Sequence, residues 1–377
     1  MKNMPRWDIF CAVVDNYGDI GVSWRLVRQL ANEHGLAVRL WVDDLRPLSR
    51  LCPAVDASQA LQRIEGVEVR HWPSPFSATD VSDVVIEAFA CELPDTYLNA
   101  MAARPQKPAW INLEYLSAEP WVEGCHGMAS PHPRLPLTKH FFFPGFTPAT
   151  GGLLRERDYD QRRASFDCAA FRTRLGLPAA QDGELTLSLF AYENPALPGL
   201  LDAWAKGSAP IRCLVLEGRS FADVSNFFGV AACQPGDHFA RGSLSIHVLP
   251  FLPQPDYDAL LWLCDLNFVR GEDSFVRAQW AEKPQVWHIY PQADAAHRIK
   301  LDAWLNRYLA ALPGAAADAT KNFWHAWNGD GEVVSAWHAF RSALPWLQHW
   351  ATPWAQKIAT GDSLAKKLLQ FSAHIAG

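Results

Sequence analysis

The amino-acid sequence predicts an α/β protein made of two doubly wound lobes. Its 377 residues, of which 49% are hydrophobic and 20% charged, suffice for two or three packed domains at roughly 150 residues per domain. Short runs of β-branched and aromatic residues alternate with segments of helical periodicity, an order typical of parallel sheets with crossover helices. The alternation fades at residues 117–152, where proline, glycine and serine accumulate, and then resumes. We therefore expect two similar halves that face each other across a cleft.

In the first half, a strand is expected at residues 7–14, where an apolar run ends at a polar loop. A helix follows, because Ile20, Trp24, Val27 and Leu30 recur at helical spacing. Further strands are expected at residues 37–42, 83–89 and 109–113.

The second half repeats this pattern, and its tail is helical. Strands are expected at residues 185–192, 211–216, 244–249, 266–270 and 285–290, and helices at 197–204, 257–264 and 274–281. From about residue 335, tryptophan and leucine recur at helical spacing. We expect a first lobe at residues 1–155, a second at 156–345, and a helical tail at 346–377 that packs back on the first lobe.

Composition excludes several classes of protein. The chain has 34 Lys and Arg against 40 Asp and Glu, a net charge of -6, which argues against a general nucleic-acid binder. No apolar run approaches the ~20 residues of a membrane helix, and no secretory signal is recognisable at the N-terminus. The eight cysteines are dispersed without metal-binding spacing. We expect reduced thiols, a cytoplasmic location and no membrane partner. The 17 tryptophans fit an aromatic core better than a sugar-stacking wall.

The loop after the first expected strand, Asp15-Asn16-Tyr17-Gly18-Asp19-Ile20-Gly21, is the first candidate site. Its two carboxylates lie four residues apart where the strand delivers the loop to the expected cleft. One of them suits a general base and the other its electrostatic support. The glycines allow a ligand to approach the backbone, although the segment is neither G-x-G-x-x-G nor a P-loop. The alternative is that Asp19 only caps the following helix.

A second candidate site lies at Arg270-Gly271-Glu272-Asp273-Ser274, again between a strand and a helix. The N–H groups and the positive dipole end of such a helix suit a diphosphate. A plain helix cap is the alternative.

At residues 251–257, an aromatic residue with a neighbouring amide suits a nucleobase, and core packing of Phe251 is the alternative.

Metal binding has weaker support in the sequence. Asp158-Tyr159-Asp160 matches the D-x-D pattern of some metal-dependent sugar transferases, but it lies in a polar linker rather than after a strand. The histidines show no zinc spacing. His288 lies in an expected buried strand, where a core role is favoured. We therefore expect no metal site.

Six segments of the chain resemble the EarP family of protein-arginine rhamnosyltransferases. They cover nearly the whole length and occur in the family's order. The segments are DNYGDIGVSWRLVRQL from Asp15, VVIEAFACELP from Val84, NLEYLSAE from Asn112, GGLLRERDY from Gly151, PFLPQPDYDALL from Pro250, and RGEDSFVRAQWAEKPQVWHIYPQ from Arg270.

The resemblance implies a GT-B glycosyltransferase with two Rossmann-like lobes. The first lobe is expected to receive the acceptor protein, translation elongation factor P (EF-P), and the second to hold the co-substrate dTDP-β-L-rhamnose. Rhamnose would pass to an arginine side chain with inversion at the anomeric carbon, without a metal ion or other cofactor.

The resemblance also implies roles for individual residues. The general base falls on Asp19, a second required carboxylate on Asp15, and the acid of the donor site on Glu272. The remaining implied positions bind the donor: Asp273 and Ser274 at the diphosphate, Phe251, Gln254 and Tyr257 at the thymidine, Tyr192 and Tyr290 as further contacts, and Asn16, Tyr17 and Gly18 in the first loop. Tyr257 replaces a phenylalanine of some relatives, and residues 193–195 depart from the family.

These residues suggest a chemical mechanism. A protonated guanidinium, with a pKa above ~12, is a poor nucleophile. Asp19 would accept a proton from one terminal nitrogen or orient it, while Asp15 would hold the planar group. The helix at Asp273 would stabilise the leaving diphosphate. Two other functions remain open: a GT-B transferase with another acceptor, and a regulatory module that binds a nucleotide sugar without chemistry.

Overall fold

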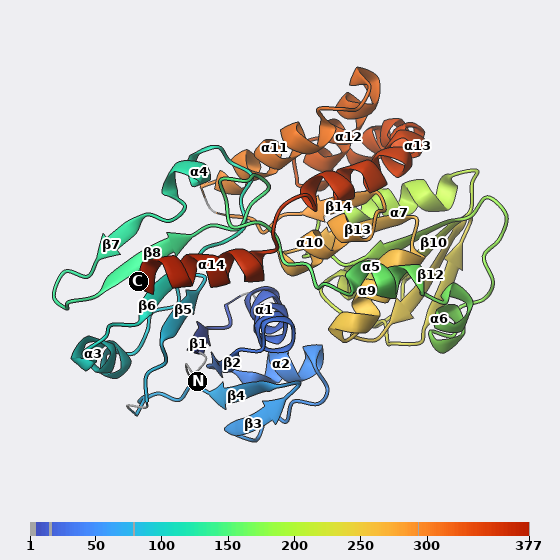
Figure 1. Cartoon of the computed structure of the whole chain (residues 1–377). Coiled ribbons are helices and arrows are strands. Elements are labelled where there is room, and N and C mark those ends of the chain that lie inside the picture. Colours follow the sequence, from blue (N-terminus) through green and yellow to red (C-terminus); the bar gives the residue numbers. More distant parts are fainter. Residues whose placement is uncertain (1–4, 15–16, 78–79, 293, 377) are drawn as a thin grey trace. The chain divides into compact units, whose positions relative to one another are not determined.

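The computed structural model describes residues 5–14, 17–77, 80–292 and 294–376. The chain divides into two compact units. The first consists of Met1–Arg157 and Ile358–Gly377, and the second of Asp158–Lys357. The sequence placed the start of the tail at residue 346, which lies inside a long helix of the second unit (Figure 1).

The first unit is a doubly wound sheet in the order β3-β4-β2-β1-β5-β6-β8-β7. All neighbouring pairs are parallel except the edge pairs β3/β4 and β7/β8. The elements are β1 Arg6–Cys11, α1 Gly18–His34, β2 Ala37–Val42, α2 Leu45–Leu51, β3 Leu61–Ile64, β4 Val67–His71, β5 Val84–Ala88, α3 Asp95–Ala103, β6 Ala109–Leu113, α4 Trp121–Cys125, β7 Ala129–Pro131, β8 Thr138–Phe142 and α14 Leu364–Ala376.

The region at residues 117–152 is more regular than the sequence predicts. β8 extends the parallel sheet beside β6, and β7 folds back along it. β8 reads Thr-Lys-His-Phe-Phe and is mostly half-buried, so it lacks the apolar run by which the central strands are recognised. The helical tail returns to this region, where Leu364 N–H donates to the Leu153 carbonyl at 2.9 Å and Phe371 packs 5.4 Å from Phe142 between ring centroids.

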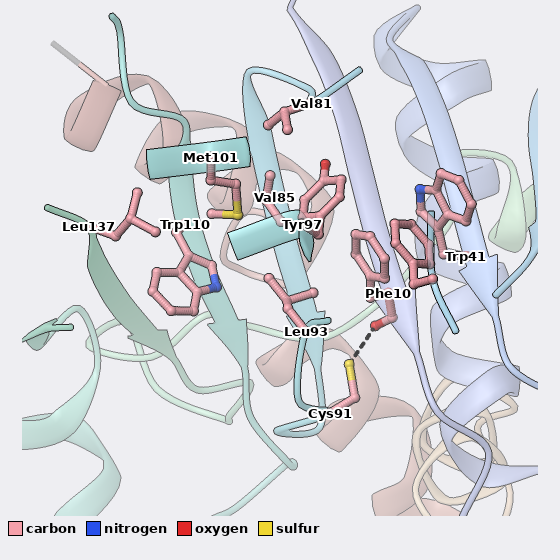
Figure 2. Close-up of a cluster of buried hydrophobic side chains, with 11 residues drawn as sticks. Phe10, Trp41, Val81, Val85, Cys91, Leu93, Tyr97, Met101, Trp110 and Leu137 are labelled. Atoms are coloured by element: carbon pink, nitrogen blue, oxygen red, sulfur yellow. Dashed lines mark hydrogen bonds between the residues drawn. The ribbon is translucent and has the colours of Figure 1, made fainter. Parts of the chain in front are cut away.

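A cluster of buried side chains joins helix α3 to the sheet of the first unit. Phe10 of β1 stacks on Trp41 of β2 at 5.6 Å between ring centroids, and it meets Tyr97 of α3 edge-on at 4.8 Å. Figure 2 shows these rings together with Met101 of α3 and Trp110 of β6. The cluster fixes the helix against strands that come from distant parts of the chain.

A buried ion pair lies within this core. Asp8 of β1 is fully buried, and Arg39 of the neighbouring β2 donates to both of its carboxylate oxygens at 2.5 Å. The Tyr97 hydroxyl also donates to this carboxylate, and burial together with the Asp8 charge raises the pKa of Tyr97. The network ties β1, β2 and α3 together.

The second unit repeats the doubly wound design, in the order β11-β12-β10-β9-β13-β14. Only the edge pair β11/β12 is antiparallel. The elements are α5 Tyr159–Ala164, α6 Cys168–Arg174, β9 Leu185–Leu189, α7 Leu197–Lys206, β10 Ile211–Leu216, α8 Ser220–Phe228, β11 His238–Arg241, β12 Leu244–Leu249, α9 Gln254–Leu263, β13 Leu266–Arg270, α10 Asp273–Trp280, β14 Gln285–His288, α11 Ala296–Leu309, α12 Gly314–Trp327 and α13 Val333–Ile358.

Tryptophans contribute strongly to the core of the second unit. Trp304 of α11 stacks on Trp324 of α12 at 4.9 Å between ring centroids, and Trp287 of β14 stacks on Phe275 of α10 at 3.9 Å. The expectation of an aromatic core is confirmed for these residues, all of them buried.

Within the described ranges, no helix combines the length and apolarity needed to cross a membrane.

The Asp8 network generates a prediction about stability. Asp8→Asn is expected to lower the free energy of unfolding by about 3 kcal/mol, because it leaves the buried Arg39 guanidinium without its countercharge. Denaturant unfolding followed by tryptophan fluorescence measures the loss. Arg46→Ala is the control, since Arg46 forms an ion pair with Asp44 at the surface, where such pairs contribute little. Equal stability of the two variants would contradict the prediction.

Candidate functional site

The carboxyl end of β1 holds the first group of candidate residues. Asp19 lies in the first turn of α1, 4% exposed, and its Oδ2 accepts a hydrogen bond from the Val14 N–H at 3.3 Å. Tyr17 occupies the N-cap position, so the interpretation of Asp19 as the cap of this helix is wrong. Gly18 is the first residue of α1. Asp15 and Asn16 lie outside the described residues.

A second carboxylate holds the same loop from the neighbouring strand. Asp43, which follows β2, accepts a hydrogen bond from the Val13 N–H at 2.9 Å. Two successive N–H groups of the loop therefore bind carboxylates that come from different elements. Asp43 has no motif around it, and only the pairing of β1 with β2 shows its proximity to the loop.

Burial raises the pKa of Cys11, at the end of β1, well above its usual range, so this thiol stays protonated.

In the second unit, Arg270 joins the loops that follow β9 and β13. It is the last residue of β13 and is 8% exposed. Its Nη1 donates to the Ala191 carbonyl at 3.2 Å. The guanidinium also lies 4.3 Å from the ring centroid of Phe190 and 4.9 Å from that of Tyr192. These cation–π contacts fix the aromatic residues at the carboxyl edge of the sheet.

Glu272 lies at the N-cap position of α10, directly after Gly271. Gly271 has a φ of 63°, a left-handed conformation that suits glycine, and its carbonyl accepts a hydrogen bond from Trp287 Nε1 at 2.8 Å. Glu272 Oε1 lies 2.8 Å from Lys300 Nζ of α11. Lys300 is a neighbour of this candidate residue that the sequence does not reveal, because 28 residues separate the two partners.

Ser274 and Asp273 begin helix α10. The Arg270 N–H donates to Ser274 Oγ at 3.1 Å, and Ser274 Oγ donates back to the Arg270 carbonyl. The hydroxyl therefore closes the turn between β13 and α10. Gln254, the first residue of α9, is buried, and its Nε2 lies 3.5 Å from Asp273 Oδ2. The structure thus brings together two helix starts that the sequence separates.

Two further aromatic candidates lie at the same edge. Tyr257 of α9 is buried and meets Phe190 edge-on at 5.8 Å between ring centroids; burial raises the pKa of its hydroxyl. Phe251 is half-buried in the loop before α9. Its N–H donates to Glu217 Oε2 at 3.2 Å. Glu217 follows β10. Like Lys300, it contacts a candidate residue but belongs to none of the sequence motifs.

Tyr192 and Tyr290 also lie together, although the sequence placed both inside strands. β9 ends at Leu189 and β14 at His288, so both tyrosines belong to the loops that follow. Their ring centroids are 5.4 Å apart. Tyr192 is buried, whereas Tyr290 is 54% exposed. His288 is buried next to Tyr192, and desolvation lowers its pKa to about 3, so it is neutral at physiological pH.

The D-x-D segment precedes and begins helix α5. Asp158 pairs with Arg162 at 3.1 Å and Asp160 with Arg163 at 3.8 Å. Tyr159 between them is buried and lies against Arg277. In the described ranges, no group of three or more His, Cys, Asp and Glu side chains is arranged to hold a metal ion.

Sequence and structure comparisons identify relatives along nearly the whole chain. The family model described as "Elongation-Factor P (EF-P) rhamnosyltransferase EarP" matches residues 7–373. The "Protein-arginine rhamnosyltransferase" of Pseudomonas putida is 53% identical over 370 residues, which cover 97% of this chain and 98% of the relative.

Solved structures agree with this relationship. The structure described as "Structural basis for EarP-mediated arginine glycosylation of translation elongation factor EF-P" has a TM-score of 0.71 at 39% identity, covering 98% of this chain and 99% of that chain. The calicheamicin glycosyltransferase CalG4 has a TM-score of 0.51 at 14% identity over the full length of both chains, a likeness of fold alone. The chain therefore belongs to the EarP family of EF-P rhamnosyltransferases and is a glycosyltransferase of the GT-B fold.

Proposed function

We propose that this protein transfers L-rhamnose from dTDP-β-L-rhamnose to an arginine side chain of EF-P, with inversion at the anomeric carbon and without a metal ion or other cofactor. The observation that carries the proposal is the gathering of the family's donor positions at one edge of the second sheet. Gln254 lies against Asp273, and Tyr192 lies against Tyr290. Because the acceptor is a translation factor, the reaction would take place in the cytoplasm.

On the acceptor side, Asp19 supplies the base. An arginine guanidinium is protonated at neutral pH and must lose or share a proton to attack the anomeric carbon. The Asp19 carboxylate accepts from Val14 through Oδ2, and a carboxylate has further lone pairs for a guanidinium N–H. It would orient one terminal nitrogen and take its proton as the bond to carbon forms. Asp15 would support the ion from the same loop.

On the donor side, the start of α10 would bind the diphosphate. The N–H groups of a helix's first turn and the positive end of its dipole stabilise an anion there. Asp273 and Ser274 occupy this turn. Charge develops on the diphosphate as the bond to rhamnose breaks, so these interactions strengthen in the transition state. Phe251, Gln254 and Tyr257 would hold the thymidine.

Glu272 would orient the donor through hydrogen bonds from its hydroxyl groups. Glu272 would be a second carboxylate, beside Asp273, near the negatively charged diphosphate, and like charges repel each other. The ion pair with Lys300 offsets this charge and fixes the Glu272 side chain. We therefore assign Lys300 a positioning role, which acts through Glu272.

Intact-mass measurement tests the proposed function. Purified protein, unmodified EF-P and dTDP-β-L-rhamnose are mixed in EDTA, and the adduct is mapped by peptide fragmentation. Addition of one deoxyhexose to a single arginine supports the proposal. An adduct on free arginine or on a glycan, but not on EF-P, would indicate another acceptor. Donor that binds without being consumed would indicate a regulatory module.

Replacement of Asp19 tests the base. Asp19→Asn is expected to lower kcat by about 100-fold or more, because the amide accepts no proton. The donor dissociation constant, measured by calorimetry, should stay the same. Asp43→Asn is the matched control, since Asp43 also holds an N–H of this loop. An equal loss of kcat in both variants would assign Asp19 to loop structure rather than to catalysis.

Replacement of Lys300 tests the positioning role. Lys300→Gln is expected to raise the donor KM about tenfold, because an uncompensated Glu272 repels the diphosphate. The additional substitution Glu272→Gln should restore part of this loss. Lys321→Gln is the control, because Lys321 pairs with Asp302 in the same unit. An unchanged donor KM in Lys300→Gln would contradict the assignment.

A further inference from the structure

Two left-handed residues follow β5 in the first unit. Phe89 has a φ of 59° and Ala90 a φ of 56°, a conformation that non-glycine residues rarely adopt. Hydrogen bonds hold both residues there: the Phe89 N–H donates to the Leu113 carbonyl at 2.7 Å, and the Ala90 N–H donates to Asn112 Oδ1 at 3.1 Å. Such backbone conformations persist only where their surroundings enforce them, and they cluster at functional sites.

Asn112 of β6 connects this turn to a carboxylate. Its side chain is buried. While Oδ1 accepts from Ala90, Nδ2 donates to Glu114 Oε1 at 2.5 Å. One amide therefore holds both the turn after β5 and the half-buried Glu114 after β6. This arrangement fixes a negative charge at the carboxyl edge of the sheet.

The turn also directs an aromatic ring. Phe89 stacks on Tyr115, with ring centroids 4.8 Å apart and an interplanar angle of 27°. Tyr115 is 41% exposed, and the left-handed backbone is that of its stacking partner Phe89. The strained turn therefore positions the ring on which an exposed aromatic residue stacks. Phe89, Tyr115 and Glu114 are called the aromatic platform below.

The aromatic platform directly follows β5 and β6, in the same sheet as β1, which leads into the Asp19 loop. β1, β5 and β6 are consecutive neighbours in the sheet. Cys11 pairs with Ala88, and Ala88 pairs with Leu113, so the three strands end at the same level. At about 4.8 Å per strand, the ends of β1 and β6 are about 10 Å apart. Loops that follow strands at this separation can contact one ligand.

We propose that the aromatic platform binds the guanidinium of the acceptor arginine, with its flat face on the Tyr115 ring and its N–H edge shared between Glu114 and Asp19. Aromatic rings attract cations over their faces, and carboxylates match the planar fork of a guanidinium. Asn112 is the positioning residue of this site. The inference rests on the proposed function, since it identifies the part of the acceptor that the first unit recognises.

Three variants test the aromatic ring. Tyr115→Leu is expected to raise the acceptor KM about fivefold to tenfold, the effect of one lost cation–π contact. Tyr115→Phe keeps the ring and should remain close to wild type. The donor KM should not change in either. Leu61→Ala is the control, because Leu61 is an exposed apolar residue on the edge strand β3. An unchanged acceptor KM in Tyr115→Leu, or an equal rise in Tyr115→Phe, would overturn the proposal.

Glu114→Gln tests the charge separately. Glutamine still accepts a hydrogen bond from Asn112, so the turn is retained. The acceptor KM should rise about fivefold and depend less on salt concentration. An unchanged acceptor KM would remove Glu114 from the site.

Direct binding separates failure of this inference from failure of the proposed function. Wild-type protein that adds no deoxyhexose to EF-P would contradict the proposed function. Calorimetry of EF-P binding to wild type and Tyr115→Leu then still tests the aromatic platform. Equal affinity of the two would overturn the inference even where rhamnose transfer is confirmed.

Discussion

The parallel register of the strands is the constraint on which both candidate sites depend. In the first unit, the pairs Cys11–Ala88 and Ala88–Leu113 end three strands at one level. The loops that follow therefore emerge together, although almost 100 residues separate Asp19 from Tyr115 in sequence. In the second unit, the parallel strands β9, β13 and β14 likewise deliver Tyr192, Glu272 and Tyr290 to one edge. The hydrogen-bond ladder thus decides which polar residues meet.

Buried ion pairs hold the elements beneath these edges. Asp8 and Arg39 are partners in the register of β1 and β2, and their ion pair lies in the core below the Asp19 loop. In the second unit, Arg277 of α10 donates to the fully buried Asp258 of α9 at 2.7 Å. Separating the two side chains would leave a buried charge without its partner, which is strongly unfavourable. This pair therefore holds α9 against α10. The starts of the two helices, where Gln254 and Asp273 lie, are fixed as a consequence.

The sequence predicted the central strands of both sheets because these are short, mostly apolar runs, as in Val84–Ala88 and Ile211–Leu216, each of which contains one charged residue. It missed β3 at one edge of the first sheet and β8 beside the edge strand β7, because polar residues interrupt the apolar pattern of both strands. The strand-to-helix motifs located the loops of Asp19 and Glu272 correctly at carboxyl ends of strands. Their partners Asp43 and Lys300 could not be predicted, because these contacts arise from tertiary packing between segments that share no motif.

The proposed reaction needs one site for a cation, the acceptor arginine, and one for an anion, the nucleotide-sugar donor. Carboxylates lie at the edge of the first sheet, among them Asp19 and Glu114, and these two suit a cationic arginine. The donor is an anion, yet Glu272 and Asp273 lie at the start of α10. The ion pair with Lys300 offsets the charge of Glu272. The helix dipole then remains attractive for a diphosphate. A net charge of -6 is therefore compatible with the proposed cation site on one unit and anion site on the other, because the balance is set locally.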